Sequence, residues 1–327
     1  MSRVFNRDLL GDLARQRVVL FLGAGVSASA ITASGQRIAG WPKFLRDCAQ
    51  RTDDPLRAQL VRLLDGKDYL LACELLQHHF GDDWGDIVTA EFGQQATPSP
   101  LHAALLGLRQ RIIITTNFDK LIETAWANFT DGGTHLPKVI SGVDQQVFRV
   151  LKDHEGKYLL KIHGTFDDAR SLIFSRSEYI RLAFGNENYS NFLEALLLNF
   201  TFIYVGFSMD DPAITSLMEM YTLRYPTSRP HYIFTPQGIE ENIVEVHKRL
   251  RKLVVIQYDS KDNHAALAPL IEDLGRQARA RYRTLVSDMM NFVENEPDNE
   301  SLEVPEPVLG EATLDNATQF EANATGS

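Results

Sequence analysis

Two residues of this chain, Asn117 and His163, combine a reactive side chain with a position at the end of a short apolar run. A histidine of near-neutral pKa can act as a general base, and an asparagine amide can bind a hydroxyl group or orient a water molecule. Another run ends in the turn Gly23-Ala24-Gly25, which can present bare backbone N–H groups to a phosphate. Taken singly, the histidine has an ordinary alternative as a hydrogen-bonded structural residue, and the glycine turn has one as a plain tight turn. Helix capping accounts for Asp119 but not for Asn117, because a cap does not need a second polar residue two positions earlier.

The elements that must position these residues are buried strands, each followed by a helix. The first run, at 18–22, is too short for a helix of normal length and apolar throughout, as in a strand buried on both faces. Similar runs occur at 111–117, 157–165, 200–208, 230–235 and 253–258, with helical spacing between most of them. This alternation predicts a doubly wound, parallel Rossmann-like α/β sheet, whose ligand binds at the carboxyl ends of the strands.

Other stretches define the organisation of the chain. Apolar residues recur at three-to-four spacing over 41–109, which predicts a helical insertion after the first strand. Short β-like pieces are expected at 138–140 and 147–151. From Thr284 to Ser327 the chain has ten acidic residues and no Lys or Arg, so the net charge of −10 belongs to this tail. We therefore expect a catalytic domain at 1–285 and an acidic, disordered tail at 291–327.

Composition narrows the class of protein. The two cysteines, Cys48 and Cys73, are too few for a disulfide framework or a four-cysteine zinc site. The first 283 residues are formally neutral, so direct nucleic-acid binding is not evident. No signal-peptide pattern or membrane-spanning apolar run is present in the sequence. We expect a cytoplasmic protein that does not bind membranes.

Four strand ends taken together resemble the sirtuin family. Gly23-Ala24-Gly25-Val26-Ser27 resembles the phosphate turn of that family, and Thr115-Thr116-Asn117-Phe118-Asp119 resembles its Gln-Asn-Ile-Asp segment. Lys161-Ile162-His163-Gly164 resembles its catalytic His-Gly, and Gly206-Phe207-Ser208 resembles its Gly-Thr-Ser. Their order and separations cover 17–274, most of the folded chain. Each motif is short, and the four in this order are specific.

The resemblance implies NAD+ as the ligand and assigns roles to individual residues. Asn117 and His163 are the implied catalytic residues. The implied NAD+-binding residues are Gly23, Ala24, Gly25, Ser27, Thr116, Asp119, Gly206, Ser208, Asp211 and Tyr258. For Asp211 and Tyr258, helix capping or packing explains the residue equally well.

The chain departs from sirtuin deacylases because it lacks the cysteines of their zinc module, so we expect no zinc. In this it resembles the divergent sirtuin-like domains of bacterial anti-phage systems, which hydrolyse NAD+. The resemblance implies an NAD+ glycohydrolase that depletes NAD+ as a defence effector. The alternatives are an NAD-dependent deacylase or ADP-ribosyltransferase, and a non-catalytic sensor of NAD or ADP-ribose. Because a free NADase is toxic, we expect control through a homo-oligomer or through a partner protein, such as an ATPase or a sensor.

Overall fold

A computed structural model describes residues 3–294 except 33, 34, 36, 39, 94, 130–135, 169 and 170. The chain divides into two units, Met1–Thr284 and Leu285–Ser327, and all the predicted site residues lie in the first. Most of the tail expected at 291–327 falls outside the described residues. No helix in the described ranges is both long and apolar enough to span a bilayer.

The first unit is built on one large parallel sheet of seven strands. Their order is β5-β6-β4-β1-β7-β8-β9, and every neighbouring pair is parallel. The strands are β1 (Val18–Leu22), β4 (Ile112–Thr115), β5 (Lys138–Ser141), β6 (Tyr158–Lys161), β7 (Thr201–Val205), β8 (His231–Pro236) and β9 (Leu253–Tyr258). The chain leaves β1 towards β4 and later returns to the other side of β1 at β7, so a topological switch point lies beside β1. The predicted doubly wound α/β sheet is confirmed.

The strand β1 shows how the core is divided between the two faces of the sheet. Val18, Leu20 and Leu22 pack into one cluster, and Val19 and Phe21 pack into the other, as the two-residue period of a strand requires. The first cluster is covered by α1 (Arg7–Ala14), α7 (Pro100–Leu106), α8 (Leu121–Phe129) and α15 (Leu267–Glu294). The second is covered by α10 (Arg176–Gly185), α11 (Glu187–Asn199) and α12 (Pro212–Arg224), with α13 (Glu241–Arg251) beside α12 and β9.

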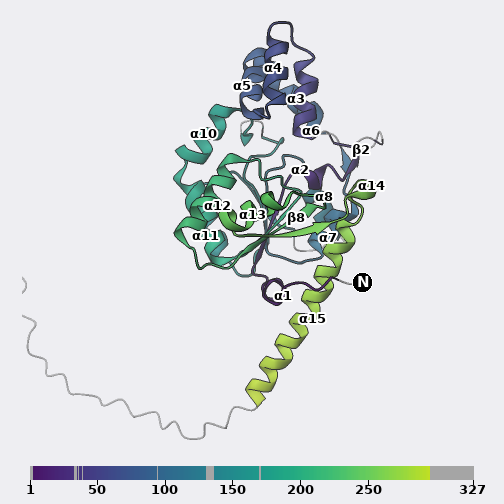
Figure 1. The fold of residues 1–327 in the computed structure, drawn as a ribbon, viewed down its shortest axis with the longest axis vertical. Helices are drawn as coiled ribbons and strands as arrows, with labels where there is room; N and C mark the ends of the chain where they lie inside the picture. Colours follow the sequence, from purple (N-terminus) through teal and green to yellow (C-terminus); the bar gives the residue numbers. More distant parts are fainter. Residues whose placement is uncertain are drawn as a thin grey trace, which may run out of the picture. The chain divides into compact units, whose positions relative to one another are not determined.

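Between β1 and β4 the chain forms the predicted helical insertion. It contains α3 (Trp41–Ala49), α4 (Leu56–Asp65), α5 (Tyr69–Phe80), the 3-10 helix η1 (Gly81–Asp83) and α6 (Trp84–Phe92). These helices lie together beyond the end of the sheet opposite α1 (Figure 1). Their apolar cluster includes Trp41, which stacks on Phe174 at 5.2 Å and lies 6.2 Å from Phe118. The insertion therefore packs directly against the segment that carries Asn117.

One segment differs from the sequence-based expectation, and the structure adds a few small elements. The β-like piece expected at 147–151 is wrong, because the chain there forms η2 (Gln145–Phe148) and α9 (Arg149–Lys152). The Asp144 carboxylate accepts a hydrogen bond from the Gln146 N–H at 2.8 Å, which starts a helical turn, and Val147 and Val150 bury at helical spacing. A small antiparallel sheet, β2 (Ile31–Thr32) with β3 (Ala96–Thr97), flanks the insertion. Two single-turn helices, α2 (Ala24–Ser27) and α14 (Lys261–His264), complete the elements.

Candidate active site

Asn117 and His163 come together because their strands are neighbours in register. In the parallel pair β4–β6, Thr115 lies opposite Lys161. Asn117 and His163 each follow two residues beyond this pair, so both emerge at the same edge of the sheet. Both are buried, with 7 % and 8 % of their surface exposed. Both residues lie just beyond strand ends, as predicted, and the register shows that these two ends are adjacent.

The Asn117 side chain is fixed by a hydrogen-bond network between the ends of β1 and β4. Its amide donates to the Gly23 carbonyl at 2.9 Å and to the Ser27 hydroxyl at 2.8 Å. The Ser27 hydroxyl in turn donates to Asp119 Oδ2 at 2.5 Å. The other Asp119 oxygen accepts the Leu121 N–H at 2.9 Å at the start of α8. Asp119 is therefore a helix cap as well as a member of the network, and both amide hydrogens of Asn117 are used within the protein.

The glycine turn after β1 packs against the turn after β7. A Cβ on Gly23 would lie 2.4 Å from the Gly206 carbonyl oxygen, and a Cβ on Gly25 would lie 2.8 Å from Gly206 Cα. The N–H groups of Gly23 and Gly25 donate to the carbonyls of Val205 and Gly206 at 3.0 and 2.9 Å. These glycines are thus required for backbone approach. The prediction that these two glycines present bare N–H groups to a phosphate is wrong, because protein carbonyls already accept both N–H hydrogens.

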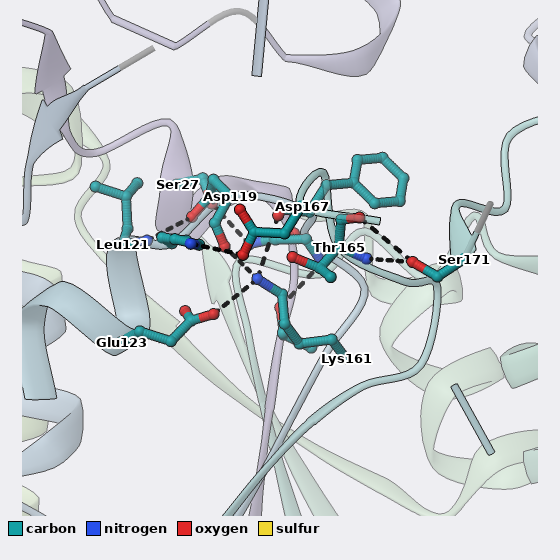
Figure 2. A network of polar contacts seen from close by, with 12 residues as sticks. Ser27, Asp119, Leu121, Glu123, Lys161, Thr165, Asp167 and Ser171 are labelled. Atoms are coloured by element: carbon teal, nitrogen blue, oxygen red, sulfur yellow. Dashed lines mark hydrogen bonds and ion pairs between the residues drawn. The ribbon is translucent and has the colours of Figure 1, made fainter. Parts of the chain in front are cut away.

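A buried lysine supports the segment that follows Asn117, and Figure 2 shows Lys161 beside Glu123 and Asp119. Lys161 is fully buried, and its ammonium donates to the carbonyls of Phe118 and Asp119 at 3.2 and 2.5 Å. It also pairs with Glu123 Oε1 at 2.9 Å. Lys161 is not among the residues predicted for the site. The sequence does contain a sign of its importance, because Lys161 lies between Leu160 and Ile162 in a strand expected to be buried. A buried charge needs partners.

His163 is held in a mostly apolar setting and faces one carboxylate. Its Nε2 lies 3.5 Å from Asp211 Oδ2 and has no hydrogen-bond partner within the part of the chain that the structure describes. Burial lowers the pKa of His163 below its ordinary value, and the negative charge of Asp211 opposes this shift. The imidazole is therefore neutral at physiological pH, as a general base must be. The next residue, Gly164, has φ +89°, and a Cβ there would lie 2.1 Å from the Ser171 carbonyl oxygen.

The other residues predicted to bind NAD+ are spread along the same edge of the sheet. Ser208, after β7, is exposed, and Thr116, between β4 and Asn117, is half-buried. The Asp211 carboxylate caps α12 through the N–H groups of Ala213 and Ile214, both at 3.1 Å. At the end of β9, the Tyr258 hydroxyl lies 2.9 Å from His264 Nδ1. Ala24 begins α2, beside the Asn117 network. For each of these residues the NAD+-binding role stays a prediction.

No cluster of three or more His, Cys, Asp or Glu side chains suited to a metal occurs among the described residues. The two cysteines, Cys48 and Cys73, are free and buried, and both belong to the apolar cluster of the insertion. Burial raises the pKa of the Cys48 thiol to about 11, so this side chain is a neutral packing group at physiological pH.

The parallel sheet, the glycine turn and the polar strand ends together define a Rossmann-like α/β domain with its candidate site at the carboxyl ends of the strands. Residues 111–256 match the family model of the SIR2-like domain, which confirms the resemblance found in the sequence.

Curated relatives point in the same direction. The chain is 28% identical over 261 residues to NAD(+) hydrolase ThsA of Enterococcus faecium, which covers 75% of this chain and 48% of that protein. It is 27% identical over 238 residues to NAD(+) hydrolase ThsA of Cytobacillus dafuensis, covering 71% and 44%. It is 23% identical over 274 residues to Defense-associated sirtuin 2 of Bacillus subtilis, covering 78% and 25%. The chain thus spans about half or less of the length of these relatives.

Proposed function

We propose that this site hydrolyses the nicotinamide–ribose bond of NAD+ and that the chain acts as an effector of bacterial anti-phage defence. The observation that carries the proposal is the placement of a fixed asparagine and a buried, neutral histidine beyond one pair of strands in register. Relatives named NAD(+) hydrolase support the substrate, and a relative named as a defence-associated sirtuin supports the biological role.

The residues divide the chemistry between them. The C1′–N bond breaks with its electron pair passing to the nicotinamide nitrogen, and positive charge develops on the ribose. The Asn117 amide oxygen can hold a ribose hydroxyl or the attacking water, because its amide hydrogens are already donated to Gly23 and Ser27. The water oxygen bonds to C1′, and His163 takes its proton and later releases it to solvent. The products are nicotinamide, ADP-ribose and one proton.

The direct test is incubation of the full chain with NAD+, with nicotinamide and ADP-ribose followed by chromatography. Loss of a general base typically costs 10²- to 10⁴-fold in rate, so we expect His163→Gln to lose at least about 100-fold. Asn117→Ala removes the group that positions the ribose or the water, so we expect it to lower the rate as well. The matched control is His154→Gln, because His154 is exposed and precedes β6, whereas His163 follows it. Urea unfolding of each variant checks that lost activity does not reflect lost structure.

Cellular NAD+ provides a second measurement, since purified protein can require an activator. Expression of the wild-type chain, alone or with the products of neighbouring genes, is expected to lower cellular NAD+ relative to His163→Gln. NAD+ binding without turnover in every condition would contradict the proposal and favour a sensor. Nicotinamide release only with an acylated or acceptor protein would favour a deacylase or transferase.

Control of the activity is the remaining part of the proposal. An NADase that is always active would deplete its own host, so we propose that self-association or a partner protein restrains it. Measurement of molecular mass by light scattering, with and without the candidate partner, tests this separately from catalysis. A monomer that hydrolyses NAD+ at full rate on its own would contradict it.

A further inference from the structure

The Asp211 carboxylate lies where it can control the proton on His163. Resting on the proposed function, we propose that Asp211 is a positioning residue that keeps the proton of neutral His163 on Nε2, so that Nδ1 is the basic atom of the site. Asp211 follows β7 and His163 follows β6, so the pair joins two separate strand ends. The role predicted for Asp211 from the sequence, contact with NAD+, is the competing assignment.

The two oxygens of Asp211 have different surroundings. Oδ1 accepts hydrogen bonds from the Tyr179 hydroxyl and from the N–H groups of Ala213 and Ile214, both at 3.1 Å. These three donors saturate Oδ1 and fix the carboxylate plane. Oδ2 accepts none of these three hydrogen bonds and lies 3.5 Å from His163 Nε2.

The chemistry of a neutral imidazole decides the tautomer. One ring nitrogen carries the proton and the other carries a lone pair, whereas an ionised carboxylate only accepts. If the proton were on Nδ1, the lone pair of Nε2 would face the lone pairs of Asp211 Oδ2. With the proton on Nε2, the same contact is attractive and satisfies a nitrogen that otherwise has no partner among the described groups. The distance of 3.5 Å is long, and catalytic hydrogen bonds often shorten when the substrate binds.

Tyr179 holds the Asp211 carboxylate in place by a hydrogen bond. Its hydroxyl donates to Asp211, and its ring lies 6.1 Å from the His163 ring in an edge-on arrangement. Burial and the Asp211 charge raise the pKa of Tyr179 far above its ordinary value, so the tyrosine stays a neutral donor at any physiological pH. Asp211 and Tyr179 are the titratable side chains that face His163 from the end of β7 and from α10.

The test compares Asp211→Asn with Asp210→Asn in the full chain. Asparagine caps a helix about as well as aspartate, so α12 keeps its N-terminal cap and only the charge is lost. Asp210 is the exposed neighbour and serves as the control. Histidine-selective ¹⁵N NMR, with the His163 signal identified by its absence in His163→Gln, reports which ring nitrogen carries the proton.

We expect Nε2–H in the wild type and in Asp210→Asn, and mainly Nδ1–H or a mixture in Asp211→Asn. Losing the carboxylate behind a catalytic histidine can cost about 10⁴-fold in kcat through the wrong tautomer. Because the contact here is longer, we expect about 10- to 100-fold in kcat with KM changed less than about threefold.

Nδ1–H in the wild type, or an unchanged tautomer and kcat in Asp211→Asn, overturns the proposal. A raised KM with unchanged kcat also overturns it and favours contact with NAD+. If the wild type does not hydrolyse NAD+ at all, the proposed function fails, and the NMR comparison still decides the tautomer.

Discussion

The replacement Lys161→Met tests whether the lysine beneath the site holds the Asn117 segment in place. Methionine has a similar length and no charge, so it fills the buried space but donates no hydrogen bond. The change leaves two backbone carbonyls and one Glu123 oxygen without the donor that now lies 2.5 to 3.2 Å from them. Breaking a buried ion pair by removing one partner costs about 3–5 kcal/mol.

The Glu123 side chain is 21 % exposed and can gain water, so the lower end of this range applies. We expect the free energy of unfolding to fall by about 3 kcal/mol, measured by urea denaturation followed by circular dichroism. The matched control is Lys120→Met, because Lys120 forms an ion pair with Asp167 in which both side chains are about half exposed. Exposed pairs contribute about 0–1 kcal/mol.

A double-mutant cycle with Glu123→Gln separates the ion pair from the two carbonyl contacts. If the ion pair dominates, Lys161→Met should cost much less in the Glu123→Gln background, with a coupling energy of about 1–2 kcal/mol. If Lys161→Met destabilises no more than Lys120→Met, the lysine does not brace the site and the reasoning is refuted.

Two further predictions concern backbone approach and acid stability. Gly206→Ala should destabilise by about 2–3 kcal/mol and abolish activity, because φ is +63° and its Cβ would lie 2.5 Å from the Val26 nitrogen. Gly142→Ala, at φ +85° with nothing within 4 Å of its Cβ, should cost only about 1 kcal/mol, and equal losses would contradict the steric argument. Burial lowers the pKa of His102 from an ordinary 6.5 to about 4, so the unfolded chain binds a proton at this histidine more readily than the folded chain. The free energy of unfolding should therefore fall by roughly 3 kcal/mol as the pH falls from 6.5 to 4. His102→Gln keeps an acceptor for the Ser99 N–H, so it should flatten unfolding curves measured between pH 6.5 and 4, and an unchanged slope would contradict the assignment.

Much of the fold could be predicted because a buried parallel strand and its end are both visible in the sequence. The apolar run at 18–22 becomes β1 with the same bounds, and the glycine that follows marks where the chain turns. The β-like reading at 147–151 failed because valines three residues apart also suit a short helix, and the cap at Asp144 decided between the two. Short apolar segments remain ambiguous whenever a local side-chain hydrogen bond selects the backbone.

The candidate site could be predicted in its members but not in its connections. Asn117 and Ser27 were assigned separate roles, whereas the structure joins them by one hydrogen bond across 90 residues. The same holds for His163 and Asp211, whose contact depends on β6 and β7 lying on opposite sides of the central strands. Such contacts follow from strand order, and no local pattern encodes strand order.

Lys161 and Asp211 support the site in different ways, so their contributions can be measured separately. Lys161 fixes backbone carbonyls beneath Asn117, so its loss should lower stability and disturb the position of the asparagine. Asp211 faces a ring nitrogen of His163, and its Asn replacement retains the helix cap, so its loss should change proton chemistry with little change in stability. Measuring the free energy of unfolding and kcat for both variants therefore distinguishes a residue that holds the site together from one that sets the state of its base.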